Sequence, residues 1–600
     1  MIMKTKYIIY SLLLIFLVSC QGEDFLTKYP KDQLVEATTF TTNANFQTYA
    51  WKFYETFPGY HRNDRISYLQ EMESDLMVNN SGSIGNAIFW QNKTIPASSK
   101  IYTKGYAKIR DIHLMLDNIE GSQLTDEEKL HWEGVGKFFR AYEYFFLLKT
   151  YGPTPLITSG VTDQDTTELY KARATRDEMA DFILQDLKDA EQKISPTGNG
   201  PNTINTNVVR ALISRFGLVE GTWRKYHNLG GETKFLEASK AASTALIAEF
   251  PTLNSDYDAV FNSESLKGVD GIILYKAYEF AILTGNYAHY NRSSIGSEDI
   301  TKKGADMFLC LDGQTIHTSP LFDGEKDPYD EFRNRDRRMY VNIVPPFRVY
   351  TGGKNQLTWE YDPDKKNREY IDLMVTLYPN EKQKRLPTMN WRGLIVRVSP
   401  HFRKYNEGHG FNVTYSGYAF HKYYNTYSKL QSQDATDCPI FRMGEVLLNH
   451  AEVMKELGQF DQSVADATIN KLRDRGAVAH LDINNIPDDP TRDADVDPVM
   501  WEIRRERFVE YFGEGFGRAL DIKRWGKLVE YGAKEKVGRW IKKSDYKGKV
   551  PIVGGGDEGY VKIFGVPPGV PEYYYLEPLP SNEIVLNPKI KQNPGWDTNN

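Results

Sequence analysis

Three carboxylates lie close together in the stretch LQEMESDLM, namely Glu71, Glu73 and Asp75. A retaining glycosidase needs two carboxyl groups about 5 to 5.5 Å apart in a cleft to cleave a glycosidic bond. Spacing along the chain cannot establish such a cleft, because consecutive side chains point in different directions in helices and strands. Glycan hydrolysis therefore stays open as an alternative, which the release of new reducing ends from a polysaccharide would reveal.

Other residue types that support catalysis or metal binding lack the required spacing. No HExxH motif, G-x-S-x-G nucleophile motif or phosphate-binding loop is found. The histidines considered are His113, His131, His289, His401, His421 and His450. Cys310 and Cys438 could form a pair, but two thiols this far apart define no disulfide framework. No metal site, cofactor or catalytic residue is predicted.

Aromatic residues offer a second kind of chemistry, the stacking of flat rings on sugar faces. The chain contains 38 Tyr, 30 Phe and 10 Trp, an aromatic share of 13%, so some rings are expected outside the core. A sugar site also needs planar amides or guanidinium groups that bind hydroxyl pairs. Candidate binding residues are Trp90, Asn92, Tyr290, Arg292, Trp359 and Trp391. For each ring the competing interpretation is a place in the core.

The N-terminus reads as a secretion signal that ends at a cysteine. Lys4 and Lys6 precede an apolar run, Tyr7 to Val18, that is shorter than the roughly 20 residues of a membrane-spanning helix. The run meets Cys20 in the sequence LVSC, which resembles a bacterial lipobox. We expect a signal peptide at 1–19, lipidation of Cys20 and a tether at 20–36, since two acyl chains suffice for stable anchoring. The alternative is a free thiol beside an ordinary cleavage site.

Helical patterns flank a central region of different texture. Apolar residues recur at three- and four-residue steps in GVGKFFRAYEYFFLLKTYG, TNVVRALISRFGLVEGT and FRMGEVLLNHAEVMKELGQF, and DQSVADATINKLRDRG also reads as helical. Thr175 and Glu178 predict a capping box at the start of another helix. The helical scaffold is expected mainly at 100–250 and 439–530. Residues 253–439, rich in Gly, Asn, Tyr and Pro, predict a loop-rich insert with small strands, and such loops commonly carry binding sites.

The chain of 600 residues is long enough for a large core, and its net charge of −6 gives no electrostatic case for nucleic acid. Several stretches resemble the SusD/RagB family of outer-membrane lipoproteins and occur in that family's order. They are DFLTKYP, FFRAYEYFFLLKTYGPTPLI, RATRDEMADFILQDLKDA, MFLCLDGQTI, RNRDRRM, FRMGEVLLNHAEV, INKLRDRGA, RRERFVEYFGEGFGRALDIKRWG and LEPLPSNEIVLNPKIKQNPGW. The acidic pair in CQGED resembles the surface-export signal of such lipoproteins.

The resemblance implies a mainly α fold across residues 37–600, with tetratricopeptide-like helical hairpins as scaffold and an irregular, loop-rich, small-strand ligand-binding region. It implies a protein anchored to the outer membrane and facing the cell exterior. There it would bind an oligosaccharide or polysaccharide and cover a SusC-like TonB-dependent transporter as a lid. A peptide cargo stays open as an alternative. Among the candidate rings the resemblance favours Trp90, because glycan-binding members often carry an aromatic residue in this early loop.

Three of the matched motifs are interpreted as structural. The charges of the segment 504–521 predict either a solvated helix face or an ion-pair network; they are Arg504, Arg505, Glu506, Arg507, Glu510 and Asp521. Pro594, Gly595 and Trp596 predict a turn followed by a ring packed on the scaffold. Asp312 and Gly313 predict a turn between short strands, so a nucleophile at Asp312 is not expected.

Overall fold

The computed structural model describes most of the chain. The described residues are 39–61, 68–79, 89–91, 93–161, 164–292, 298–352, 358–380, 382–387, 395, 397–402, 414–428, 430, 432–514 and 517–596. The predictions made for Cys20, Asn92 and Trp391 lie outside these residues, as do the predicted signal peptide and tether. Within the described part, no helix has both the length and the apolar character that crossing a membrane requires.

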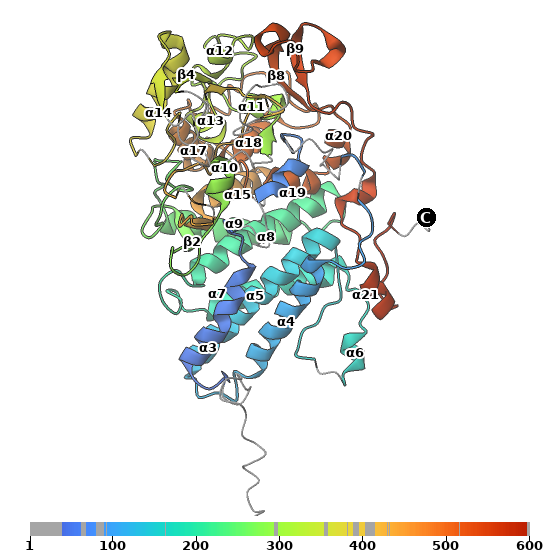
Figure 1. The fold of residues 1–600 in the computed structure, drawn as a ribbon. Coiled ribbons are helices and arrows are strands. Elements are labelled where there is room, and N and C mark those ends of the chain that lie inside the picture. Colours follow the sequence, from blue (N-terminus) through green and yellow to red (C-terminus); the bar gives the residue numbers. More distant parts are fainter. Residues whose placement is uncertain are drawn as a thin grey trace, which may run out of the picture.

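Long helices form the scaffold, and each packs against the next along the chain. In order they are α4 (Lys100–Asp117), α5 (Asp126–Tyr151), α7 (Arg176–Lys193), α8 (Thr206–Tyr226), α9 (Thr233–Glu249), α15 (Met443–Glu456) and α18 (Pro498–Glu510). Helices α4, α5 and α7 lie side by side in the lower half of Figure 1, with α8 and α9 above them. The predicted mainly helical fold is therefore confirmed.

Local sequence explains where these helices begin. Thr175 accepts a hydrogen bond from the backbone N–H of Glu178, and the Glu178 carboxylate accepts one from the Thr175 N–H at 2.7 Å, so the predicted capping box is confirmed. Thr125 and Glu128 form a second capping box at the start of α5, which the sequence analysis missed. A cap contributes about 1 kcal/mol to helix stability by satisfying N–H groups that lack intrahelical partners.

The central region contains more helix than predicted. Its strands are β2 (Ile272–Lys276), β3 (Glu298–Ile300), β4 (Phe347–Thr351), β5 (Trp359–Tyr361), β6 (Val398–Ser399) and β7 (Cys438–Arg442), and its helices are α10 (Tyr287–Arg292), α11 (Lys302–Asp306), α12 (Pro328–Phe332), α13 (Arg337–Asn342), η4 (Lys365–Arg368) and α14 (Glu369–Leu377). The predicted small strands are present, together with short helices that the sequence did not predict because they are too short to show periodicity. The side chains of Asp327 and Asp336 cap α12 and α13 instead.

Pairing between distant strands organises this region. Strand β2 pairs antiparallel with β7, so the chain before and after the central region is joined. The three-stranded sheet has the order β5–β4–β6. Strand β3 pairs with β1 (Met77–Asn79), which lies far upstream. In Figure 1 the elements β4, α12 and α14 lie in the upper half, opposite the α4–α5 end of the scaffold.

Shorter elements complete the two ends of the chain. They are α3 (Asn43–Ala50), η2 (Trp51–Thr56), η3 (Tyr68–Glu73), α6 (Thr166–Leu169), α16 (Gln462–Ala467), α17 (Ile469–Gly476), α19 (Arg518–Arg524), α20 (Leu528–Gly532), β8 (Val537–Lys542), η6 (Lys543–Tyr546), η7 (Val553–Gly555), β9 (Glu558–Lys562), η8 (Glu572–Tyr575) and α21 (Ser581–Leu586). The helical stretch predicted after Gly458 is two helices, because Thr468 leaves the helical conformation at φ −127° and ψ −82°.

The motifs that were interpreted as structural are indeed structural. Trp596 is buried, stacks on Tyr574 at 4.9 Å and donates a hydrogen bond to the Tyr573 carbonyl. Gly313 adopts φ +79°, and its N–H donates to the Cys310 carbonyl, which confirms the turn. Cys310 and Cys438 are buried free thiols, so the pair that they could have formed is not present.

The charged segment 504–521 forms a buried ion-pair network, and the solvated-face interpretation was wrong. Glu510 is fully buried and accepts hydrogen bonds from Arg442 at 2.6 Å and from Arg338 at 3.2 Å. Arg507 pairs with Asp521 at 2.8 Å. Charges this deep require several partners each, because burial of an unpaired ion costs several kcal/mol. The network therefore joins α18 to α13, β7 and α19.

Candidate functional site

Strands and single backbone bonds bring several distant segments of the chain together. The N–H of Asn286, which directly precedes α10, donates to the Tyr60 carbonyl at 2.9 Å. Asn79, the last residue of β1, pairs with Glu298, the first residue of β3. The segments 62–67, 80–88 and 293–297 therefore all begin or end within two residues of these contacts.

Asp299 on β3 brings Thr414 and Tyr415 to the same place. The buried Asp299 carboxylate accepts hydrogen bonds from the Thr414 hydroxyl at 2.9 Å and from the Tyr415 N–H at 2.6 Å. Thr414 directly follows the segment 403–413. We call this set of joined residues the loop frame; it consists of Tyr60, Asn79, Asn286, Glu298, Asp299 and Thr414. The loop frame thus joins residues from four distant parts of the sequence.

Buried tyrosines support the loop frame from within. Tyr60 stacks near-parallel with Tyr278 and with Tyr287, each at 6.2 Å between ring centroids. Tyr423 meets Tyr60 and Tyr287 edge-on at 5.3 and 4.9 Å. Burial raises the pKa of the Tyr60 hydroxyl well above its usual value. These four rings are core residues, which explains part of the high aromatic content.

Trp90 lies at the end of the segment that leaves β1. Its ring is half-buried and packs with Phe89 against a cluster that contains Tyr531 and Val570. The Gln91 side-chain amide donates to the Gly569 carbonyl at 2.9 Å, which holds this segment against the C-terminal part of the chain. Trp90 also borders a small hollow next to the Lys536 side chain.

Lys536 attaches the root of β1 to β8. Its ammonium donates to the Met77 carbonyl at 3.0 Å and lies 4.2 Å from the centre of the Phe89 ring. Burial lowers the pKa of Lys536 to about 7, with Asp75 and Glu73 acting in the opposite direction. The start of β1 is therefore held by one half-buried lysine.

The other candidate residues fall in different places. Tyr290 and Arg292 belong to α10, which starts next to the loop frame. Trp359 lies on β5, a separate sheet, where it is half-buried against the main core and meets Tyr361 edge-on at 4.9 Å. The structure thus brings the end of β1 and the start of α10 to one frame and places Trp359 on another sheet. The binding roles of these residues, and of Asn92 and Trp391, stay predictions.

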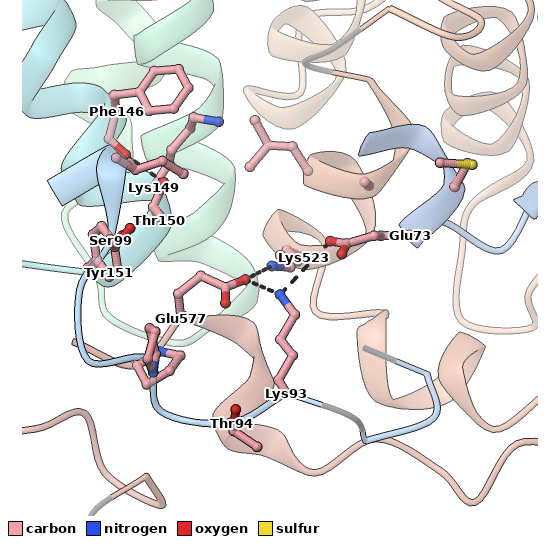
Figure 2. A pocket seen from close by; sticks show the side chains of 16 residues that line it. Glu73, Lys93, Thr94, Ser99, Phe146, Lys149, Thr150, Tyr151, Lys523 and Glu577 are labelled. Atoms are coloured by element: carbon pink, nitrogen blue, oxygen red, sulfur yellow. Dashed lines mark hydrogen bonds and ion pairs between the residues drawn. The ribbon is translucent and has the colours of Figure 1, made fainter. Parts of the chain in front are cut away.

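The carboxylates suggested for hydrolysis make structural contacts. Asp75 pairs with Arg518 at 2.9 Å and with Lys303 at 2.7 Å; burial opposes its charge, but these two cations lower its pKa far below the usual range. Glu71 accepts the Arg518 N–H at 2.9 Å, and burial raises the pKa of Glu71 to about 8, so it holds a proton at neutral pH. Glu73 lines a cavity, where it faces Lys93 (Figure 2).

One group of three carboxylates in the described part of the chain has metal-like spacing. Oxygen atoms of Asp493, Asp495 and Glu530 lie within 4.8 Å of one another. The Lys527 ammonium contacts Asp495 and Glu530 at 2.7 Å each and lies 3.8 Å from Asp493. A lysine therefore already supplies the positive charge, and this group gives no reason to infer a metal ion.

Sequence reasoning could not have found the loop frame. Its contacts join residues that are more than a hundred positions apart, and no local pattern marks Asn79 or Glu298 as partners. The only available signal was the position of each candidate ring within a polar, glycine- and asparagine-rich stretch.

Family comparisons cover almost the whole chain. A model described as the SusD family matches residues 276–596, and a model described as starch-binding, associating with outer membrane, matches residues 24–218. A SusD-like protein, P38, from Formosa agariphila is 23% identical over 530 residues, which cover 85% of this chain and 89% of that protein.

Solved structures share the fold. A SusD-like protein from Bacteroides fragilis NCTC 9343 superposes with a TM-score of 0.67 at 20% identity, over 95% of this chain and 100% of that one. A SusD-like carbohydrate-binding protein from the same strain gives 0.66 at 18% identity over 92% and 100%. A laminarin-binding SusD-like protein gives 0.52 at 17% identity over 93% and 100%.

Proposed function

This chain belongs to the SusD family, and from that membership we propose that it is a surface-exposed, lipid-anchored protein that binds an oligosaccharide and delivers it, as a lid, to a SusC-like TonB-dependent outer-membrane transporter. The observation that carries the binding role is the loop frame. Residues from four distant parts of the chain are joined there on a base of paired strands and stacked tyrosines. Binding sites commonly occur where loops are held by such a base. Relatives described as starch-, laminarin- and carbohydrate-binding support a glycan as the ligand.

Trp90 is the proposed stacking platform of this site, with Asn92, Tyr290 and Arg292 as polar or aromatic neighbours, and with Trp359 and Trp391 as further candidate rings. An exposed site with one or two stacking rings gains about 1 to 3 kcal/mol per ring, by analogy with base stacking. A few hydrogen bonds add about 0.5 to 1.5 kcal/mol each, and the cost of association removes much of this gain. Dissociation constants in the millimolar to micromolar range are expected.

A glycan array followed by calorimetric titration tests the binding role, using the chain that starts after Cys20. Trp90→Ala should weaken binding of the identified glycan at least about tenfold, equivalent to about 1.4 kcal/mol. Trp51→Ala is the matched control, because Trp51 is 58% exposed on η2, outside the loop frame. If no glycan binds and a peptide library does, the cargo is a peptide. If Trp90→Ala binds normally, or loses about 3 to 5 kcal/mol of stability as a core ring would, Trp90 is not the platform.

Anchoring and transport need separate experiments. Cys20→Ala should release the protein from membranes, and protease added to intact cells should digest the wild-type protein. Mild detergent extracts should contain a stable complex with a large TonB-dependent barrel. Full protection in intact cells would contradict surface exposure. Recovery of only free protein, with glycan growth unaffected by its deletion, would contradict the transport role.

A further inference from the structure

A cavity of about 530 Å³ lies on the scaffold between α4, the segment 155–161, the end of α6 and α21. In Figure 1 these three helices lie in the lower part of the view, below α10. The volume is within the range of roughly 300 to 1,000 Å³ that is typical of small-molecule sites. No residue of the loop frame lines this cavity, so a ligand held here would occupy a separate site.

Hydrogen bonds fix the walls of this cavity to one another. The Tyr106 hydroxyl on α4 donates to the Pro155 carbonyl at 2.6 Å. The Asn587 side-chain amide, which directly follows α21, donates to the Lys171 carbonyl at 2.8 Å. The Lys171 ammonium in turn donates to the Leu156 carbonyl at 3.3 Å. The walls from these separate parts of the chain are therefore joined, and the cavity is formed before any ligand arrives.

Most of the lining is apolar, and the rim exposes large apolar side chains. Leu586 is 67% exposed, Leu169 is 48% exposed and Tyr170 is 44% exposed. Contiguous exposed apolar surface on a protein commonly marks a place where something binds. An apolar group of a ligand would be buried here against aliphatic and aromatic side chains, which also include Tyr102, Tyr106, Ile109, Pro155, Ile157 and Ile590.

Two charged side chains in this lining have no partner among the described residues. The Arg110 guanidinium on α4 is exposed, and the Glu583 carboxylate on α21 is half-buried. Burial raises the pKa of Glu583, so a cation beside it would stabilise its charged form. His113, which also lines the cavity, is neutral at pH 7 because burial and nearby Arg140 lower its pKa to about 4. The cavity therefore offers one positive and one negative group.

The two charges lie toward opposite ends of the α4 wall. The N–H of Asn582, the residue before Glu583, donates to the Ala97 carbonyl at 3.0 Å, which places Glu583 near the start of α4. Arg110 lies about 15 Å along α4 from the first residue of that helix, at a rise of 1.5 Å per residue. The two long side chains shorten the gap that a ligand must bridge, and an extended tripeptide spans roughly 10 Å.

We propose that this cavity binds a short apolar peptide with free ends, its C-terminal carboxylate at Arg110 and its N-terminal ammonium at Glu583. Arginine suits a carboxylate because its planar guanidinium donates two parallel hydrogen bonds. A neutral sugar would leave both charges without a partner and would bring few apolar groups to an apolar wall. The proposal concerns a site separate from the loop frame and does not rest on the function proposed above.

Calorimetric titration of the chain that starts after Cys20 tests the proposal with trileucine and three related peptides. Trileucine should bind at least about threefold more tightly than trileucine amide or N-acetyl-trileucine, each of which lacks one terminal charge. This difference is equivalent to about 0.6 kcal/mol per charge, as expected for a solvent-accessible ion pair. Triglycine keeps both charges and should bind at least about tenfold more weakly, because it buries no apolar side chain. Equal affinities for trileucine and its two capped forms would overturn the proposal.

Two variants test which residue reads which end of the peptide. Arg110→Met should remove the preference for a free carboxylate and keep the preference for a free ammonium, and Glu583→Gln should do the reverse. Lys104→Met is the matched control, because Lys104 is an exposed lysine on the same helix outside the lining. Charge preferences that survive both variants would contradict the assignment. The comparison of the four peptides on the wild type remains decisive if a variant fails to fold.

Further outcomes separate this site from other occupants and from the loop frame. Trp90→Ala should leave trileucine binding unchanged. Binding that is lost in Trp90→Ala and kept in Arg110→Met would place the peptide at the loop frame and overturn the proposal. Sedimentation of a dimer that Leu586→Ser disrupts would place a second copy of the chain over the cavity and overturn it as well. Trileucine binding in a protein that binds no glycan would support this site and contradict the proposed function.

Discussion

Two charge clusters in this protein both pair basic side chains with glutamates, but one pairs arginines in the core and the other pairs lysines beside a cavity. The closed cluster around Glu510 lies between α13, β7 and α18, where the paired side chains of Arg338, Arg442 and Glu510 are at most 4% exposed. The open cluster around Glu577 borders a cavity, and the Lys93 and Glu577 side chains are 16% and 27% exposed. The two clusters therefore differ in how deeply their charged side chains are buried.

The two clusters also differ in whether their basic side chains keep hydrogen-bond donors that no carboxylate uses. Arg442 in the closed cluster donates to the side chains of Glu510 and Glu514 and to the Glu510 carbonyl. Such a network holds helices in register, and it is destabilising to break because an ion would remain buried without its partner. In the open cluster, water reaches the ions and Lys523 has no carboxylate within hydrogen-bond distance among the described residues. Charge clusters with spare donors beside a cavity are candidates for binding, and closed ones are structural.

The largest expected effect is from Glu510→Gln. Removing this charge leaves Arg338, Arg442 and Arg475 without a shared anion, so the free energy of unfolding should fall by about 3 to 5 kcal/mol. Urea unfolding at neutral pH measures this change. The control is Glu191→Gln, which breaks a half-exposed pair with Arg210 and should change stability by at most about 1 kcal/mol. Similar losses of stability in both variants would show that the buried ion pairs of the closed cluster contribute no more than a half-exposed pair.

The lowered pKa of the Glu510 carboxylate predicts that the folded protein loses stability in acid. Burial would raise the pKa of Glu510, but Arg475, Arg442 and Arg338 lower it from 4.5 to about 2. Because the pKa of Glu510 is lower in the folded state than in the unfolded state, ionised Glu510 stabilises the fold fully above about pH 4.5. This stabilisation is lost as the pH falls toward about 2. The loss amounts to about 3 kcal/mol. The stability difference between wild type and Glu510→Gln should therefore shrink from pH 7 to pH 2.5, and a constant difference would contradict this assignment.

In the open cluster, Glu577→Gln should have a smaller effect on stability. The water-exposed side of the cavity screens the remaining lysines, so the free energy of unfolding should fall by only about 1 kcal/mol. Urea unfolding of the wild type and the variant measures this change, and a loss as large as that of Glu510→Gln would show that the two clusters contribute alike to stability.

The smallest expected effect on stability comes from Lys523→Met. Its ammonium has a lowered pKa and a distant partner, so an apolar side chain of similar length should change the unfolding free energy by less than about 1 kcal/mol. Thermal melts of this variant and of Lys534→Met should nearly coincide. A loss comparable to that of Glu510→Gln would place Lys523 in the scaffold and remove the distinction between the two clusters.

Local features of this protein could be predicted from the sequence. The capping box of Thr175 and Glu178, the apolar faces of the long helices, the turn at Gly313 and the ordered family motifs each depend on residues close together in the chain. Their hydrogen bonds form within a few residues, so the residue types and spacing specify them directly. The short helices α12 and α13 escaped prediction because a single Asp cap carries almost all of their local signal.

Tertiary structure alone decided which residues meet. Glu577 reaches Lys93 across 484 positions, and Asp75 reaches Arg518 across 443. The sequence presented the charges of 504–521 as either a solvated face or a network, and only the packing of α18 against its neighbours resolved the choice. Likewise, it could not tell that Tyr60 is a core ring and that Trp90 is half-buried at the surface. Burial depends on the whole fold, because a side chain's solvent access is set by distant segments that pack over it.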